Sequence, residues 1–204
     1  MIVKTMRRRE RPFGEHPDAG GAFPEENCGQ IWRVSLRHGR VNHVDTTTTP
    51  LTLHPFTVAD AERLLSGEVD PHDGWEGAYA FTDEPELLSE YLLAVQENGD
   101  PRPFGPYLVR RGEDGPAIGG VNLFGPPDDD GAVDFVFGLV PAVRGHGLAA
   151  HTVTAVVELS RAAGVSVLRA EAEVGNLPAR QTLEKIGFAQ VARTPEEIIY
   201  ELRL

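Results

Sequence analysis

The stretch AVDFVFGLVPAVRGHGLAA, residues 132–150, decides the fold of this 204-residue chain. Its first half, residues 132–140, is a run of β-branched and aromatic residues with the length of a buried strand. Its second half carries Gly145 and Gly147 and leads into an apolar-faced helix that we expect to end before Gly164. A strand, a glycine-bearing turn and a helix N-terminus together form an anion site, because the free N–H groups of the first helical turn and the helix dipole point to one place.

The composition of this turn suits a phosphate group. Gly145 and Gly147 allow a positive φ and a close approach of the backbone, and Arg144 adds a positive charge. The chain contains no GxxxxGK[ST], which excludes a P-loop nucleotide enzyme. The spacing Gly145-x-Gly147-x-x-Ala150 matches a dinucleotide fingerprint, but it does not follow its strand directly, and the remaining chain is too short for a Rossmann domain. An ordinary glycine-rich turn is the alternative interpretation.

Strands and helices alternate on both sides of this stretch. Before it, we expect strands at 51–56, 106–111 and 117–124 and helices at 57–67 and 86–98, the first helix opened by the capping-box spacing of Thr57 and Asp60. After it, we expect a strand at 165–174, a helix at 177–187 and strands at 188–193 and 197–204. The order predicts a mixed α/β (α+β) domain, with antiparallel hairpins ahead of a strand–helix–strand unit.

The chain divides into two predicted parts. Residues 51–204 form the compact domain, and residues 1–50 are an N-terminal extension, irregular at first and then a predicted hairpin within 30–45. The apolar side chains of that hairpin need burial on the domain or on a partner chain. No apolar run reaches the roughly 18–20 residues of a membrane helix, and the basic N-terminus resembles no secretory signal. The single Cys28 gives no internal disulfide or Cys-based zinc site, so we expect a cytoplasmic protein without membrane contact.

Charge indicates the class of ligand. The chain carries 19 Lys and Arg and 31 Asp and Glu, a formal net charge of −12. Eleven of the basic and twenty-five of the acidic residues lie in 51–204. Such a surface repels phosphate backbones, so we expect no nucleic-acid partner, and it attracts cations such as amines. Solubility alone is the alternative explanation of the charge.

Several of these pieces, in this order and spacing, resemble one superfamily. The strand AVDFVFGLVP, the loop VRGHGLA, the strand LRAEAEV, and Asn176 followed by LEKIGF are similar to the GNAT superfamily of acetyl-CoA-dependent N-acetyltransferases. The opening LTLHPFTVADAERL resembles the RimJ/RimL-type branch, which acetylates protein N-termini and various small amines. The resemblance covers residues 51–204 and implies a central mixed sheet flanked by helices. It also implies acetyl-CoA as cosubstrate, an amine acceptor and no metal.

The resemblance also implies which residues bind acetyl-CoA. The pyrophosphate would be held through backbone N–H groups by Arg144, Gly145, His146, Gly147, Leu148 and Ala149. Leu139 and Val140 would pair with the pantetheine arm like an added strand, and a backbone N–H there would polarise the thioester carbonyl. Asn176 would lie beside the pantetheine, and its alternative role is the N-cap of the following helix.

The reaction needs a neutral amine, and an alkyl amine with a pKa of about 10 is mostly protonated at neutral pH. A general base therefore helps. Asp134, an acid in an otherwise apolar strand where the family often has Glu, is our candidate for this base, and a solvent-facing position is its alternative. Further candidate bases are Glu171, Glu173, His54, His72 and His146. Trp75, Tyr79 and Phe81 lie in a long loop and are candidates for the acceptor site or for peripheral packing.

The sequence departs from the family at the general acid. Many members have Tyr where this chain has Leu183, and RimJ/RimL-type members often have Ser where it has Ala179. Neither residue here can donate a proton. The sequence predicts transfer of acetyl from acetyl-CoA to a primary amine, on a protein N-terminus or a small molecule, by direct attack on the thioester. The alternative is a catalytically degenerate acyl-CoA-binding sensor or assembly subunit, and a homodimer is an assembly that the sequence leaves open.

Overall fold

The computed structural model describes residues 32–33, 51–68 and 85–204. The elements before the anion turn are β1 (Trp32–Arg33), β2 (Leu51–Pro55), α1 (Val58–Leu65), α2 (Pro85–Asn98), β3 (Gly105–Arg111), β4 (Ala117–Phe124) and β5 (Ala132–Leu139). After β5 come the 3₁₀ turn η3 (Pro141–Val143), α3 (Leu148–Ala162), β6 (Val167–Glu173), α4 (Leu177–Ile186), β7 (Ala189–Arg193) and β8 (Glu197–Arg203). From β2 onward, every predicted helix and strand is confirmed to within two residues.

The strands of the described chain form one mixed sheet in the order β1-β2-β3-β4-β5-β6-β8-β7. Neighbouring strands are antiparallel except β5 and β6, which are parallel and are connected through α3. Placing α3 between two parallel strands is the crossover that this geometry requires. The predicted fold class, a mixed sheet flanked by helices, is therefore confirmed.

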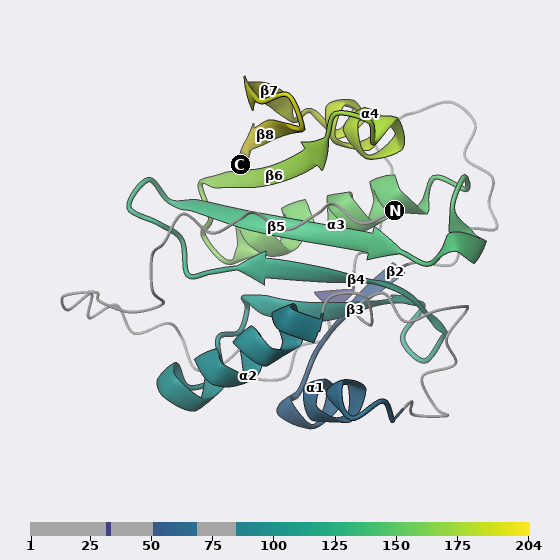
Figure 1. The fold of residues 1–204 in the computed structure, drawn as a ribbon, viewed down its shortest axis with the longest axis vertical. Coiled ribbons are helices and arrows are strands. Elements are labelled where there is room, and N and C mark those ends of the chain that lie inside the picture. The colour runs from purple at the N-terminus through teal and green to yellow at the C-terminus, as the bar shows by residue number, and fades with distance from the viewer. Residues whose placement is uncertain (1–31, 34–50, 69–84) are drawn as a thin grey trace.

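Strand alternation assigns the two faces of the sheet to different helices. In β5, Phe135 and Phe137 belong to the main core, which includes Val153 and Val156 of α3. Val136, between the two phenylalanines, belongs to a second core with residues of α1 and α2. In Figure 1, α1 and α2 lie at the β2–β3 end of the sheet, α3 lies behind β5, and α4 lies beside β6 and β8. A residue two positions from Val136 thus shares the α1/α2 face.

The local end signals read from the sequence are present. Thr57 and Asp60 form the capping box of α1: the Asp60 N–H donates to Thr57 Oγ1 at 3.2 Å and the Thr57 N–H donates to Asp60 Oδ2 at 2.8 Å. Gly164 follows the end of α3 with φ +76°, the left-handed conformation expected of a glycine after a helix.

Only part of the N-terminal extension can be compared with its prediction. Trp32 and Arg33 form β1 and pair antiparallel with Leu53 and Thr52 of β2, so this short segment extends the sheet of the domain. The rest of the hairpin predicted within 30–45 lies outside the described residues. His72, Trp75, Tyr79 and Phe81 also lie outside them.

Candidate active site

The candidate site begins where β5 and β6 separate. The two strands pair only over their first residues, and the last pair is Asp134 with Arg169. On its other side, β5 stays paired with β4 as far as Leu139. Beyond Asp134, the edge of β5 that faces β6 therefore has no strand partner among the described residues. Figure 1 shows the arrowheads of β5 and β6 well apart, although the strands begin side by side.

The register of β4 and β5 decides which backbone groups face this open edge. The Val140 N–H donates to Ile118 O of β4 at 2.9 Å. Because hydrogen-bonding direction alternates along an antiparallel strand, the neighbouring Leu139 N–H points the other way, toward β6. The Leu139 carbonyl also points away from β4 and accepts a hydrogen bond from Arg144 Nε at 3.1 Å. Leu139, and not Val140, thus offers a free N–H to an extended ligand.

The turn after β5 presents a row of free donors. Hydrogen bonding of backbone N–H groups stops at Arg144 and resumes with Ala150, whose N–H donates to Gly147 O at 3.1 Å. The five N–H groups of residues 145–149 have no backbone acceptor in the described chain. Gly145 and Gly147 have φ +85° and +75°, and no heavy atom lies within 4 Å of a Cβ placed on either. These donors, at the N-terminus of the 15-residue helix α3, fit a pyrophosphate group.

Asp134 lies at the point where the strands separate, on the α1/α2 face. Its side chain is 34% exposed, so it is neither on the core side nor fully in solvent. The oxygen Oδ1 is buried and has no hydrogen-bond partner, and Arg169 Nη1 is 3.7 Å from it. Burial raises the pKa of the Asp134 carboxyl; Arg169 opposes this shift, and the nearby Asp128 and Glu201 add to it. A carboxylate with a raised pKa and a free oxygen has the properties of a proton acceptor.

The two predicted carboxylates of β6 differ in environment. Glu171 lies on the part of β6 beyond its last pair with β5, and strand alternation places it on the same face as Asp134. Burial raises the pKa of the Glu171 carboxyl, and the negative charges of Glu197 and Asp134 raise it further. Glu173 is exposed, at the end of β6. Glu171 is therefore the second acid that the structure brings close to the site.

The described histidines occupy different places. His146 is exposed within the anion turn, with Nδ1 3.4 Å from Val143 O. His54 pairs with Leu108 in β2, and β3 and β4 separate it from β5. Three strand spacings amount to about 14 Å, so His54 is not a neighbour of Asp134.

The start of α4 contains the remaining predicted residues. Asn176 Oδ1 accepts a hydrogen bond from the Ala179 N–H at 3.4 Å, which confirms the N-cap interpretation and leaves its pantetheine contact a prediction. Ala179 and Leu183 are fully buried in the main core. Neither position offers a proton donor.

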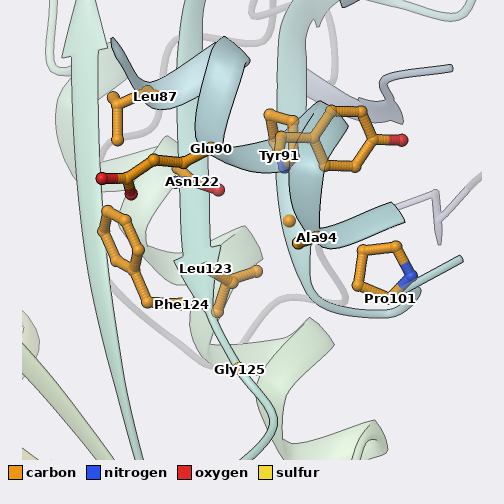
Figure 2. Close-up of a pocket in the computed structure, with 11 residues that line it drawn as sticks. Leu87, Glu90, Tyr91, Ala94, Pro101, Asn122, Leu123, Phe124 and Gly125 are labelled. Atoms are coloured by element: carbon orange, nitrogen blue, oxygen red, sulfur yellow. The ribbon is translucent and has the colours of Figure 1, made fainter. Parts of the chain in front are cut away.

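A small pocket of about 40 Å³ lies on the α1/α2 face of the sheet, between α2 and the strands β3 and β4. Figure 2 shows Glu90 and Tyr91 of α2 on one side and Asn122 and Phe124 of β4 on the other. Asn122 is only 6% exposed, and Phe124 pairs across the strands with Asp134. The pocket thus lies next to the strand pair that contains Asp134 and not at the anion turn. Asn122 and Arg169 are two residues whose place in the site the sequence reasoning missed. Asn122 interrupts an apolar strand pattern, whereas Arg169 follows the alternation of apolar and charged residues in its strand.

The described part of the chain lacks two features, a metal-binding group and a membrane-spanning helix. It contains no group of three or more His, Cys, Asp or Glu residues that could hold a metal ion. It also contains no helix with the length and apolar character needed to cross a membrane.

Comparison with known proteins agrees with this geometry. Residues 50–189 match the family model described as Acetyltransferase (GNAT) domain. Among similar solved structures are an acetyltransferase from Agrobacterium tumefaciens (20% identity, 82% of this chain and 99% of that chain, TM-score 0.53) and a dodecameric spermidine N-acetyltransferase from Vibrio cholerae (16%, 75% and 93%, TM-score 0.55). A third is a putative ribosomal-protein-serine acetyltransferase from Vibrio cholerae (12%, 76% and 94%, TM-score 0.52).

At these identities the similarity to solved structures concerns the fold, and no curated protein matches the sequence significantly. The family model, however, covers more than half of the chain. Its match spans the divergent strand β5, the anion turn and the start of α4, which are the elements that build the site. The chain therefore belongs to the GNAT acetyltransferase family, whose members use acetyl-CoA to acetylate an amine.

Proposed function

We propose that this protein is an acetyl-CoA-dependent N-acetyltransferase of the RimJ/RimL type that acetylates a primary amine, on a protein N-terminus or on a small molecule. One observation carries the proposal: β5 loses its β6 partner beyond Asp134 and ends at a turn with five free N–H groups. An extended arm with an anionic end fits this combination, because the open strand edge receives the arm and the turn receives the charge.

The residues that would hold acetyl-CoA follow from these contacts. The N–H groups of residues 145–149 would bind the pyrophosphate, and the edge of β5 that β6 leaves open would pair with the pantetheine arm. Val140 would support the arm only indirectly, since its N–H already donates to Ile118. Arg144 holds the Leu139 carbonyl through Nε, so its charge stays at the junction of the strand and the turn.

Acetyl-CoA, when bound, supplies an acetyl thioester. The Leu139 N–H is the donor that would stabilise negative charge on the thioester oxygen. Asp134 lies five residues before Leu139 on the same strand, about 16 Å away, so it would accept the proton of the acceptor ammonium through intervening water molecules. Loss of this proton frees the nitrogen to form the C–N bond as the C–S bond breaks. The thiolate needs no donated proton to leave, because a thiol has a pKa of about 8–9. The second amine proton passes to solvent, so the balance holds without a general acid.

The acceptor would approach from the α1/α2 face. Asp134 and Glu171 lie on that face, and the pocket beside Asn122 and Phe124 adjoins it. Carboxylates at the mouth of a site favour a cationic ligand, and most of the negative charge of the chain lies in this domain. An ammonium-bearing acceptor fits these charges.

One observation favours a second candidate, an acyl-CoA-binding sensor or assembly subunit without turnover. The positions where many relatives have Tyr or Ser are Leu183 and Ala179, and both are fully buried in the core. No hydroxyl group at these two positions could protonate the departing thiolate. The proton balance above does not require one, so we rank the enzyme first.

The test uses the full chain with acetyl-CoA and a panel of amines and N-terminal peptides. Release of free thiol reports turnover, mass spectrometry identifies the acetylated product, and calorimetry measures acetyl-CoA binding separately. We expect thiol release on at least one amine. Asp134→Asn should lower turnover by roughly 10²-fold with acetyl-CoA affinity little changed. Binding without release on any acceptor would favour the sensor.

A further inference from the structure

Three charged side chains form one row across three adjacent strands. Asp134 of β5 pairs with Arg169 of β6, and Arg169 pairs with Glu201 of β8. Directly paired residues share a face, so the three side chains lie together on the α1/α2 face. The row crosses the sheet at the point where β5 and β6 separate.

The contacts of Arg169 are unequal. Its Nε donates to Glu201 Oε1 at 2.9 Å, which is a charge-assisted hydrogen bond. Its Nη1 lies 3.7 Å from Asp134 Oδ1 and 3.9 Å from Asp128 Oδ2, too far for hydrogen bonds. The guanidinium is thus anchored to Glu201 and stands near Asp134 without donating to it.

This arrangement matters for a base, because a carboxylate that accepts hydrogen bonds from Arg is a weak proton acceptor. Asp134 Oδ1 is buried and has no hydrogen-bond partner. A positive charge at 3.7 Å still favours ionisation of the carboxyl. We propose that Arg169 is a positioning residue that keeps Asp134 ionised. Glu201 holds the Arg169 guanidinium so that it does not donate a hydrogen bond to the free oxygen of Asp134. The inference rests on the proposed function only where it connects this carboxyl to turnover.

The charges around Asp134 show why one cation is needed. Asp128 faces it from the β4–β5 loop, Arg169 and Glu171 from β6, and Glu201 from β8. Burial and the acidic neighbours raise the pKa of Asp134, and Arg169 alone among these groups lowers it. Loss of Arg169 would leave a partly buried carboxyl among acids, which would stay protonated to higher pH.

Two substitutions should therefore move the titration of Asp134 in opposite directions. In Arg169→Gln the cation is gone, so the pKa of Asp134 should rise by about one unit, a tenfold change in proton affinity. In Glu201→Gln one acid is gone and Arg169 is released toward Asp134, so the pKa of Asp134 should fall. Arg169→Lys retains the charge and should restore most of the wild-type value. Glu173→Gln, an exposed acid at the end of β6, is the matched control and should leave the titration unchanged.

The experiment is a ¹³C NMR titration of the aspartate carboxyl groups in the full-length protein, with Asp134→Asn assigning the signal. The pH dependence of kcat/KM on the best amine is measured in parallel, and thermal unfolding confirms that each variant is folded. We expect the pKa of Asp134 to rise in Arg169→Gln and to fall in Glu201→Gln. The pH at which kcat/KM declines on the acidic side should move in the same directions. An unmoved Asp134 signal in folded Arg169→Gln would overturn the proposal, since an Arg169–Glu201 pair that only joins β6 and β8 would change stability without moving the titration of Asp134. If the signal moves and the wild type acetylates nothing, the Arg169 proposal stands and the proposed enzyme activity fails.

Discussion

Replacing Gly147 with Asp tests the anion turn directly. Gly147 is the N-cap residue of α3 and has φ +75°, and no heavy atom lies within 4 Å of a Cβ placed on it, so the side chain itself fits. A non-glycine residue in this conformation costs about 1–2 kcal/mol of folding free energy. The new carboxylate would stand among the five free N–H groups, where we place the pyrophosphate. Two unit charges about 5 Å apart repel by about 0.8 kcal/mol in water and about 3 kcal/mol at an effective dielectric constant near 20.

We expect acetyl-CoA affinity to fall by about 4-fold to about 10²-fold, since each 1.4 kcal/mol is a factor of ten. Gly147→Asn is the matched control, because Asn has the same shape, tolerates the left-handed conformation and has no charge. Calorimetry with CoA, and with a pantetheine fragment that lacks the pyrophosphate, separates charge from shape. Fragment binding should be unaffected. Equal CoA affinities for folded Gly147→Asp and Gly147→Asn would remove the turn from the proposed cofactor site.

Two further predictions concern the strands and α4. Gly119→Ala should lower the free energy of unfolding by about 2–3 kcal/mol, because a Cβ there would overlap the Gly138 carbonyl oxygen and lie 2.6 Å from Leu139 Cδ2. Urea denaturation measures this loss, and Gly175→Ala, where the space is open, should be nearly neutral. Asn176→Ala should cost about 0.5–1 kcal/mol through the lost N-cap, and Asn176→Ser should restore that stability. If Asn176→Ser binds acetyl-CoA as tightly as wild type, the predicted pantetheine contact of the Asn176 amide is wrong.

Local patterns were sufficient for most of the fold. Within the predicted strand at 165–174, apolar and charged residues alternate from Leu168 onward, which indicates opposite faces for Leu168 and Arg169. In the structure Leu168 is buried and Arg169 lies on the other face. The Thr57 capping box and the glycines of the anion turn are likewise local, because they depend on a few adjacent backbone conformations.

Other features of the site depend on register and strand order, which short patterns do not encode. Val140 and Leu139 look equivalent in sequence, yet only the register with β4 shows that one N–H is used and the other is free. Glu201 lies beside Arg169 because β8 inserts between β6 and β7, against the order of the chain. The Asp134–Arg169–Glu201 row is therefore a property of the assembled sheet.

The last prediction is that the candidate base Asp134 destabilises the folded protein at neutral pH. The folded pKa of Asp134 is raised above its unfolded value, mainly by burial. A group of this kind contributes stability fully below its unfolded pKa, near 3.9, and loses it as pH rises through the folded pKa. At pH 7 the ionised carboxylate therefore weakens the fold.

Asp134→Asn should accordingly be more stable than wild type at pH 7, by up to about 1 kcal/mol because solvent screens a side chain that is one-third exposed. The difference should shrink toward zero as the pH falls below about 4, where the wild-type carboxyl is protonated. Urea denaturation at several pH values measures it, with Glu173→Gln as the control. A variant less stable than wild type at pH 7 would mean that the attraction between Asp134 and Arg169 outweighs the cost of burying the carboxylate. Asp134 would then have a structural role in stabilising the sheet. A variant that is more stable and inactive would instead show a charged group retained at a cost to the fold, as expected of a residue that acts in the reaction.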